Sequence, residues 1–587
     1  MMDHNMKKNP VSIPHSIWPA DDIKRLERDA ADAFGLTLYE LMLRAGDAAF
    51  RVARDSYPDT RHWPPVSIPP SIWPADDIKR NPVSIPHSIW PADDIKRLER
   101  DAADAFGLTL YELMLRAGDA AFRVARDSYP DTRHWLVLCG HGNNGGDGYV
   151  VARLAQAAGI SVTLLAQESD KPLPEEAAQA RDAWLNAGGI IHAADIIWPE
   201  ATDLIIDALL GTGIAQAPRD PVAGLIEQAN AHPAPVVAVD IPSGLLAQTG
   251  ATPGAVISAA HTVTFIALKP GLLTGKARDV TGILHYDALG LEGWLASQTP
   301  PLRRFDATQL GQWLTPRRPT SHKGDHGRLA IIGGDQGTAG AIRMAGEAAL
   351  RTGAGLVRVL TRGENIAPLL TARPELMVHE LTPQSLEESL TWADVVVIGP
   401  GLGQQEWGKK ALQKVENVRK PMLWDADALN LLAINPDKRH NRVITPHPGE
   451  AARLLGCSVA EIESDRLLSA QRLVKRYGGV VVLKGAGTII AAEHHPLAII
   501  DAGNAGMASG GMGDVLSGII GALLGQKFTP YDAACVGCVA HGAAADLLAA
   551  RYGARGMLAT DLFTTLRRIV NPDVIDVNHD ESSNSAT

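Results

Sequence analysis

Cysteine is scarce in this chain, with 4 residues in 587, and aromatic residues make up only 5%. So few cysteines exclude a disulfide framework and fit a reducing compartment. Positive charge is in deficit, since the net charge is −11, and this excludes a basic surface for nucleic acid. Apolar runs such as 518–524 are far shorter than the ~20 residues of a membrane helix, and residues 1–10 show no apolar signal segment. We expect a cytoplasmic protein without nucleic-acid or membrane partners.

Two of the cysteines, Cys535 and Cys538, form a C-x-x-C pair within the Ala- and Leu-rich stretch 531–550. No second pair accompanies them, and the stretch has helical periodicity. His541, one turn on, has no carboxylate or thiolate partner at the spacing of a metal site. We interpret both thiols as buried core residues.

A long repeat is the most unusual feature of the chain. Residues 9–63 recur without a difference at 81–135, and 64–80 repeat 9–25 with two substitutions, Pro64 and Pro70. Solenoid repeats diverge in sequence, so this identity indicates a recent tandem duplication or an assembly artefact. Only the second copy continues into the rest of the pattern. We therefore predict that residues 1–80 are surplus.

The chain is rich in apolar residues, which make up 45%, and in glycine, with 56 residues. This balance favours α/β layers joined by tight turns, and the length allows two domains. The first half predicts helices followed by a Rossmann-like parallel sheet. Its expected helices are 92–106, 108–128 and 149–158, its expected strands are 136–139, 161–165, 204–207 and 236–240, and a glycine-rich loop is expected at 140–148.

A polar, Pro-containing seam at 298–304 separates this pattern from a second α/β pattern. The second half predicts a helix at 341–351 and strands at 328–332, 356–360, 395–398, 422–424, 442–444 and 480–483. The predicted domains are 81–300 and 301–577, each a three-layer α/β domain. The polar tail 578–587 is predicted to be disordered.

The sequence G-G-M-G-D at 510–514 precedes an apolar helix. Glycine amides and a helix N-terminus attract a phosphoryl group, and Asp514 among them suits removal of a proton from an attacking hydroxyl. The alternative is a glycine-rich turn in which Asp514 only starts a helix.

The loop at 140–148 contains G-x-G-x-x-G, and Glu168 follows the next strand, so a dinucleotide-binding site remains possible. Asp147 opposes that reading, because its charge would repel a pyrophosphate at the helix start. Asp147 could also be a helix cap. Asp147, Asp207 and Asp240 all fall at carboxyl ends of predicted strands, where parallel sheets bind ligands.

The first-half motifs resemble the NAD(P)H-hydrate epimerase family. They are L-M-L-R-A-G at 113–118, N-N-G-G-D-G at 143–148, D-A-L-L-G-T-G at 207–213 and V-D-I-P-S-G at 239–244. The second half resembles ADP-dependent NAD(P)H-hydrate dehydratases, which have a ribokinase-like fold. Its motifs lie at 340–341, 399–403, 445–450, 484–488 and 504–514. The fused order is similar to that of bacterial bifunctional NAD(P)H-hydrate repair enzymes, apart from the leading 80 residues.

The resemblance implies that Asp240 is catalytic in epimerisation of the R and S hydrates of NADH and NADPH. It implies a potassium ion at Asn144, Asp207 and Ser243, although Asp207 could instead be a strand-end turn former. The implied hydrate-binding residues of this domain are Asn144, Gly145, Gly146, Asp147, Gly211, Thr212, Gly213, Ile214, Ala215, Gln216, Ala217 and Asp240.

For the second domain the resemblance implies ADP-dependent dehydration of the S hydrate to NAD(P)H, with release of AMP and phosphate and with Asp514 as the catalytic base. The implied hydrate-binding residues are Ala341, Gly403, His447 and Asp514. The implied nucleotide-binding residues are Lys484, Gly485, Ala486, Gly487, Thr488, Asn504, Gly511, Met512 and Gly513. Lys484 could instead be a solvated strand-end charge. Mg²⁺ is expected with the nucleotide.

The expected partners are NADH hydrate, NADPH hydrate, ADP and further copies of the chain in a homo-oligomer. Two other functions stay open from the sequence. One is a Rossmann-like oxidoreductase or binding domain fused to a ribokinase-like small-alcohol kinase. The other is a first domain that binds partners without catalysis, against which the presence of Asp147, Asp207 and Asp240 counts.

Overall fold

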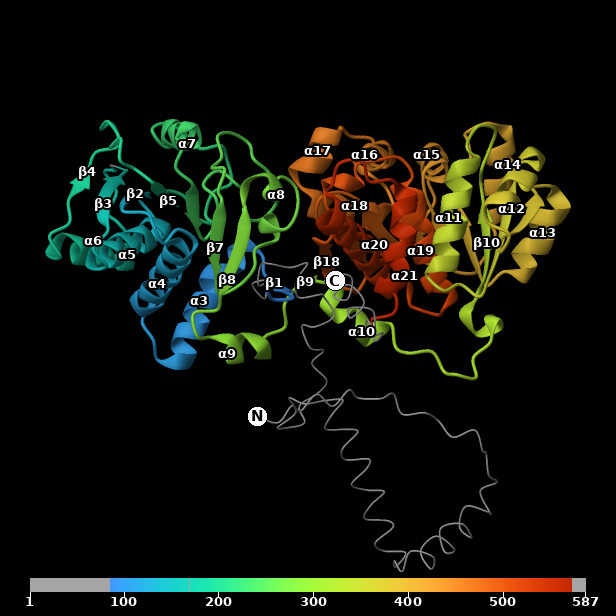
Figure 1. Cartoon of the computed structure of the whole chain (residues 1–587), viewed down its shortest axis with the longest axis horizontal. Coiled ribbons are helices and arrows are strands. Elements are labelled where there is room, and N and C mark those ends of the chain that lie inside the picture. Colours follow the sequence, from blue (N-terminus) through green and yellow to red (C-terminus); the bar gives the residue numbers. More distant parts are fainter. Residues whose placement is uncertain (1–84, 168, 573–587) are drawn as a thin grey trace, which may run out of the picture. The chain divides into compact units, whose positions relative to one another are not determined.

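The computed structural model describes residues 85–167 and 169–572 (Figure 1). All of the described residues belong to one compact unit. The surplus segment predicted at 1–80, the tail predicted at 578–587 and Glu168 lie outside the described residues.

The first sheet of the described residues has seven strands in the order β4-β3-β2-β5-β6-β7-β8, all parallel. The strands are β2 His134–Cys139, β3 Ser161–Ala166, β4 Ile191–His192, β5 Leu204–Ala208, β6 Val236–Val239, β7 His261–Phe265 and β8 Ile283–Asp287. The strand order reverses between β2 and β5, which is the position where Rossmann-like sheets form their ligand site. The predicted fold class of this domain is confirmed.

Seven α-helices belong to this part of the described chain. They are α3 Ala92–Phe106, α4 Leu110–Ser128, α5 Asn143–Ala157, α6 Glu175–Asn186, α7 Val222–Ala231, α8 Ala277–Val280 and α9 Glu292–Ser297. α3 ends at Gly107, whose φ of 64° suits a residue without Cβ, as predicted. α4 starts with a capping box between Thr109 and Glu112, two residues later than expected.

The start of α5 corrects the sequence prediction. Residues 143–148, expected in a loop, already form the first turns of α5. Glycine in a helix costs up to ~1 kcal/mol relative to alanine, so propensity argued against this start. Close packing explains it: a Cβ on Gly145 would overlap the carbonyl oxygen of Gly140, and one on Gly148 would lie 2.7 Å from the Cys139 Sγ.

The second sheet has eleven strands within the described residues, in the order β1-β9-β18-β17-β16-β15-β14-β13-β10-β11-β12. β10 to β16 are parallel, and β17 and β18 continue the sheet as antiparallel neighbours. The strands are β1 Ser88–Ile89, β9 Leu302–Arg304, β10 Arg328–Ile332, β11 Leu356–Thr361, β12 Met377–Glu380, β13 Val395–Ile398, β14 Met422–Trp424, β15 Arg442–Ile444, β16 Val480–Leu483, β17 Thr488–Ala492 and β18 Leu497–Ile500.

The chain between the two domains forms part of this sheet. β9 lies inside the predicted seam 298–304, where no strand was expected, and pairs in parallel with β18. β1, which precedes α3 in the chain, pairs antiparallel with β9. Segments on either side of the first domain therefore meet on the second sheet.

The helices of the second domain are α10 Leu310–Trp313, α11 Ala339–Arg351, α12 Ile366–Ala372, α13 Pro383–Trp392, α14 Glu406–Val415, α15 Asp427–Ile434, α16 Pro448–Leu455, α17 Val459–Ser464, α18 Arg466–Tyr477, α19 Met512–Gly525, α20 Pro530–Tyr552 and α21 Leu562–Ile569. By length and composition α20 could cross a membrane, although the apolar runs in the sequence did not predict such a helix. In the described structure, 78% of its most apolar 18-residue stretch is buried. It packs between α19 and α21 in the core.

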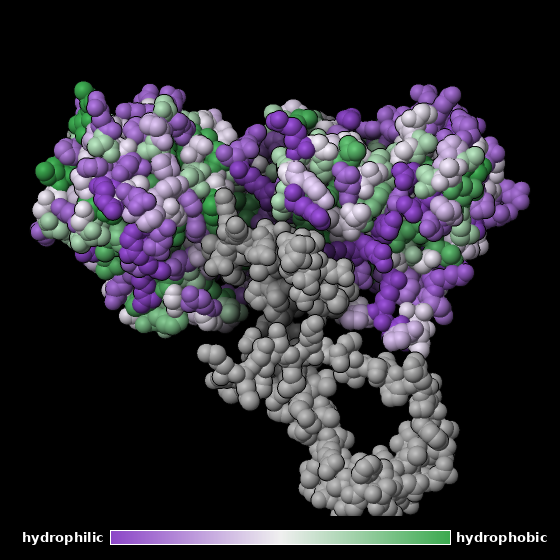
Figure 2. Space-filling view, viewed as in Figure 1, coloured by the Kyte–Doolittle hydropathy of each residue, from purple (hydrophilic) through white to green (hydrophobic). Residues whose placement is uncertain are grey.

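Alternate residues of the central strands enter different cores, which makes each domain three-layered. In β2, Val137 packs with α3 to α6, whereas Leu136 packs with α7 on the opposite face. In β10, Ile331 packs with α11, α19 and α20, and Ile332 packs with α14 to α18. Figure 2 shows hydrophilic residues spread over the visible surface of the described part, as expected when the apolar strands lie inside.

Candidate functional site

Polar side chains from neighbouring strands meet at the carboxyl edge of the first sheet. Asn144 lies in the first turn of α5, after β2, and its Nδ2 donates to the Leu210 carbonyl oxygen over 3.0 Å. Asp207 is on β5, which pairs with both β2 and β6. Asp240 directly follows β6. The sheet order therefore collects residues that are far apart in the sequence.

Asp207 is buried and fully hydrogen-bonded. Its Oδ1 accepts from the Ser243 hydroxyl at 2.5 Å, and its Oδ2 accepts from the Ser243 N–H at 2.8 Å. Burial raises the pKa of Asp207 to about 6, although these hydrogen bonds act in the opposite direction. The Ser243 hydroxyl in turn accepts from the Leu210 N–H. This group is a fixed cluster of oxygen atoms.

One atom beside this cluster has no partner. Oδ1 of Asn144 is buried and accepts no hydrogen bond from the described residues. A buried polar atom without a partner is costly, and a cation would satisfy it. With the carboxylate of Asp207 and the hydroxyl of Ser243 nearby, the donor set consists of hard oxygen ligands. These residues fit the monovalent cation implied by the resemblance.

Asp240 is paired with a buried lysine that the sequence analysis missed. Lys269 is 1% exposed, and its Nζ lies 2.5 Å from Oδ1 of Asp240. Thr264 also donates to Asp240 Oδ1, over 3.1 Å. Asp240 has a φ of 65°, an uncommon value for a residue other than glycine. The signal that could have revealed Lys269 is a lysine at the end of the apolar run 265–268, four residues after β7 ends.

The charge of Asp240 contributes to the raised pKa values of two further carboxyl groups, Glu99 and Asp147. Burial, and then Asp240, raise the pKa of Glu99 to about 7. Burial, Asp240 and Glu99 raise the pKa of Asp147 well above its ordinary value, against the opposing charge of Lys269. Asp147 was predicted, but Glu99 on α3 was not, because it falls within an ordinary run of alternating helical charges.

The loop predicted to line the hydrate, 211–217, begins at this cluster. A Cβ on Gly211 would lie 3.3 Å from the Cβ of Asn144. The loop then leaves the core, since Gly213, Ala215, Gln216 and Ala217 are exposed. Gly211 therefore lies beside Asn144, and the rest of the loop extends from there toward solvent.

The second site forms at the N-terminus of α19. α19 begins at Met512, and its N-cap Gly511 has a φ of 89°. Asp514 lies in the first turn, where amides without helical partners accumulate. Burial, followed by the charge of Asp425, raises the pKa of Asp514 to about 7, while Lys484 acts in the opposite direction. A carboxyl group with this pKa exchanges protons near neutral pH.

Lys484 is held at this site by a carboxylate that was not among the predicted residues. Its Nζ donates to Oδ1 of Asp425 at 3.2 Å, and a Cβ on Gly513 would lie 3.1 Å from that Nζ. Burial disfavours the charged ammonium, but Asp425 and Glu450 outweigh it and raise the pKa of Lys484. Lys484 is thus a paired cation beside α19 rather than a solvated surface charge.

Asp425 is 2% exposed and directly follows β14. It also accepts hydrogen bonds from the hydroxyl groups of Thr445 and Ser517, each over 2.8 Å. Its signal in the sequence is the acidic pair Asp425 and Asp427 after an apolar strand.

The remaining predicted hydrate residues of this domain lie on loops and helix starts. His447 caps α16, because its Nδ1 accepts from the N–H groups of Gly449 and Glu450. Burial and the nearby Lys484 lower the pKa of His447, which favours the neutral imidazole. The N–H of Gly403 donates to Asp427 Oδ2 over 2.9 Å. Ala341 lies in the first turn of α11.

The two thiols of α20 are buried core residues, as interpreted. Cys535 and Cys538 are free, and burial raises the pKa of each thiol. His541 is also buried, and burial lowers its pKa to about 4. Over residues 85–167 and 169–572, no group of three or more His, Cys, Asp and Glu side chains is arranged to hold a metal ion.

Comparison with known proteins matches each half to a separate family model. Residues 110–271 match the YjeF-related protein N-terminus, and residues 329–568 match NAD(P)H-hydrate dehydratase. Among solved structures, the ADP/ATP-dependent NAD(P)H-hydrate dehydratase from Bacillus subtilis, co-crystallised with ATP and Mg²⁺, is 29% identical. It has a TM-score of 0.41 and covers 45% of this chain and 95% of its own.

Two curated relatives extend over both halves. The bifunctional NAD(P)H-hydrate repair enzyme of Escherichia coli is 82% identical over 522 residues, covering 89% of this chain and 98% of the relative. The enzyme of the same description from Vibrio cholerae is 46% identical over 475 residues, covering 81% and 96%. This decides against the alternative of an oxidoreductase fused to a small-alcohol kinase. The chain belongs to the family of bifunctional NAD(P)H-hydrate repair enzymes.

Proposed function

We propose that the first domain interconverts the R and S hydrates of NADH and NADPH. The second then dehydrates the S hydrate with ADP and releases AMP and phosphate. The observation that carries the proposal is that a lysine lies near each candidate acid at the carboxyl edge of its sheet. Asp240 contacts Lys269 in the first domain, and Asp514 faces the Lys484–Asp425 pair in the second.

In the second domain, Asp514 is the group that takes the proton from the C6 hydroxyl of the hydrate. The hydroxyl oxygen attacks the β-phosphorus of ADP, and the bond to AMP breaks. The amides of Gly511 and Gly513 and the ammonium of Lys484 stabilise the negative charge on the phosphoryl group. The C6–O bond of the phosphate ester then breaks, C5 loses a proton and the ring double bond is restored. His447, Gly403 and Ala341 hold the hydrate, with neutral His447 as a positioning group.

Besides Gly511, Met512 and Gly513 at the start of α19, the predicted nucleotide residues form two short segments. Lys484, Gly485, Ala486 and Gly487 join β16 to β17, Thr488 is the first residue of β17, and Asn504 follows β18. Gly485 and Gly487 have φ values of 149° and 70°, so backbone amides can turn toward a phosphate without Cβ in the way. We assign both segments to the nucleotide on this basis and on the family's motifs.

In the first domain, Asp240 exchanges a proton with the C6 oxygen as the C6–O bond, or the ring, opens and closes. Lys269 fixes the carboxylate of Asp240. Glu99, whose pKa is raised to about 7, can return the proton to it, and burial also raises the pKa of Asp147. The hydrate is held between Asn144 to Asp147 and the loop 211–217.

Potassium is proposed at Asn144, Asp207 and Ser243. When bound, it supplies positive charge that anchors the hydrate's polar groups, and it satisfies the free Oδ1 of Asn144. Mg²⁺ is proposed to enter with the phosphates of the nucleotide. A cytoplasmic location and a homo-oligomeric assembly complete the proposal; the small number of cysteines and the negative net charge support the first.

The test uses NADH hydrate prepared in acid, which contains both epimers, and follows absorbance of restored NADH. With ADP, complete recovery is expected. Recovery that stops after one epimer would show that the first domain does not catalyse epimerisation. Parallel reactions with ATP in place of ADP determine the nucleotide, and faster recovery with ATP would overturn the proposed preference.

A further inference from the structure

The proposed nucleotide loop contacts a segment of the first domain. Thr274 follows the short 3₁₀ helix Pro270–Leu272 and is 1% exposed. Its hydroxyl donates to the Gly487 carbonyl oxygen over 2.8 Å and lies 3.3 Å from that of Ala486. A Cβ on Gly487 would overlap the carbonyl oxygen of Leu273. The loop and the segment are therefore packed without a gap.

Arg466 secures this contact from within the second domain. It is 1% exposed, and its Nε donates to the Thr274 hydroxyl over 3.1 Å. Its Nη2 donates to the carbonyl oxygens of Leu483 and Lys484, over 3.2 and 3.1 Å. Glu463 balances its charge at 2.7 Å. One buried guanidinium thus connects the strand end that carries Lys484 with a hydroxyl of the first domain.

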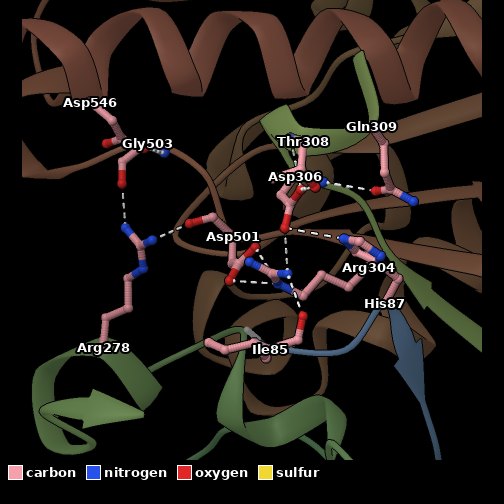
Figure 3. A network of polar contacts seen from close by, with 10 residues as sticks. All are labelled: Ile85, His87, Arg278, Arg304, Asp306, Thr308, Gln309, Asp501, Gly503 and Asp546. Atoms are coloured by element: carbon pink, nitrogen blue, oxygen red, sulfur yellow. Dashed lines mark hydrogen bonds and ion pairs between the residues drawn. The ribbon is translucent and has the colours of Figure 1, made fainter. Parts of the chain in front are cut away.

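A second contact reaches the other proposed nucleotide segment. Arg278 on α8 donates to the carbonyl oxygens of Asp501 and Gly503, as Figure 3 shows. The N–H of Gly503 and the Nδ2 of Asn504 both donate to Asp546, over 2.8 and 2.9 Å. The segment that presents Asn504 is therefore held between Arg278 and Asp546.

We propose that residues 273–278 of the epimerase domain are a positioning element of the dehydratase's nucleotide site. The inference rests on the proposed assignment of 484–488 and Asn504 to the nucleotide. Glycine-rich loops lose much conformational entropy when they become ordered on a ligand. Contacts that order them beforehand remove part of this cost, which strengthens binding. The affinity for ADP in the second domain thus depends on side chains of the first.

The experiment measures ADP binding by calorimetry and dehydration kinetics in the full chain. Thr274→Val keeps the shape of the side chain but removes the hydroxyl, and Arg278→Ala removes the second contact. Thr274→Val should raise the Kd and KM for ADP about tenfold, as expected for a lost buried hydrogen bond, with little change in kcat. Arg278→Ala should raise both by a smaller factor, about threefold, because the Arg278 side chain is exposed. Thr274→Ser should restore wild-type values, and epimer exchange should be unchanged in all three variants.

Lys276→Ala is the matched control, because it removes a cation from the same segment. The ammonium of Lys276 is exposed and contacts only Asp279, over 3.5 Å among the described residues, so its loss should leave ADP binding unchanged. A wild-type Kd for ADP in Thr274→Val and Arg278→Ala would overturn the proposal. So would an equal increase in Lys276→Ala.

A fourth variant separates this inference from the function on which it rests. Lys484→Ala should weaken ADP binding if 484–488 is the nucleotide loop. If Lys484→Ala weakens binding and Thr274→Val does not, only the role of the first domain is wrong. If Lys484→Ala leaves binding unchanged, the loop assignment itself is wrong. Should Thr274→Val fail to fold, the Arg278→Ala result decides, since that side chain is at the edge of the contact.

Discussion

The two sheets have the same parallel core but provide their reactive carboxyl groups in different ways. In the described residues, each core begins at a central strand, β2 or β10, adds two strands on one side and then four on the other. The first domain has Asp240 at the end of a core strand. In the second domain, the acid at the corresponding strand end is Asp425, which accepts a hydrogen bond from Lys484. The candidate base, Asp514, lies instead on α19, a helix that follows the added strands β17 and β18.

This difference shows how one strand order supports two chemistries. The carboxyl edge gives both domains a place for the hydrate, but the groups around the acid differ. Asp240 contacts Lys269 directly, which fixes the position of its carboxylate. Asp514 faces Asp425 across Lys484, and its pKa rises to about 7. A base for a hydroxyl proton needs a pKa of this kind.

The largest effect is expected from removing the base of the second domain. Asp514→Asn should reduce dehydration by about 10²–10⁴, because a positioned general base contributes that much. Nucleotide binding should survive, since the glycine amides are unchanged. The assay is NADH recovery with ADP, with epimer exchange followed by chromatography as the control. Recovery within a few-fold of wild type would refute the kinase-like mechanism.

The matching change in the first domain tests whether the sites are separate. Asp240→Asn should slow epimer exchange by about 10² or more while the S hydrate is still dehydrated at the normal rate. A time course on mixed hydrate should show a fast first fraction followed by slow spontaneous epimerisation. If both activities disappear together in a folded variant, the comparison between two independent sites fails.

The pH dependence of dehydration tests the raised pKa of Asp514. Because the raised pKa of Asp514 leaves it protonated below about pH 7, kcat/KM for dehydration should fall about tenfold per unit below that pH. The same shift affects stability: the folded state binds this proton more tightly than the unfolded state, so Asp514 reduces stability as pH rises from 4 to 7. Asp514→Asn should therefore raise the Tm more at pH 8 than at pH 4. A Tm change independent of pH contradicts the shift.

A smaller effect is expected from the proposed potassium site. Potassium at a hundred times its Kd should raise the free energy of unfolding of the first domain by about 2.7 kcal/mol. This should be seen as a higher Tm than in tetramethylammonium at equal ionic strength. Asn144→Ala should remove this difference, since it removes the unpartnered Oδ1. Asn143→Ala, at an exposed neighbour, is the control. An unchanged potassium effect in Asn144→Ala places the ion elsewhere.

The smallest effect is expected from deleting residues 1–80. The strand beside β9 comes from Ser88–Ile89, and its flanking contacts come from Ile85 and His87, all of which the deletion keeps. Both activities and the Tm should change little. Calorimetry of the shortened chain is the measurement, and a large loss of folded protein would show that the leading copy supports one of the domains.

Much of the fold could be read from the sequence because it depends on local spacing. The strands β10, β13, β14, β15 and β16 begin and end at the predicted residues, since short, mostly apolar runs bounded by glycine, proline or polar residues define them. The start of α5 could not be predicted in this way. Its glycines oppose a helix locally, and only contact with Gly140 and Cys139 makes the helix the better state.

The sequence by itself determined which acids follow strands and which glycines precede α19, because these features are adjacent in the chain. The tertiary structure decided which charges meet. Lys269 reaches Asp240 across 29 positions and Lys484 reaches Asp425 across 59, because sheet order, not spacing, makes them neighbours. The contact of Thr274 with Gly487 spans 213 positions and two domains. Such pairs depend on how separate layers pack, and no local pattern encodes that packing.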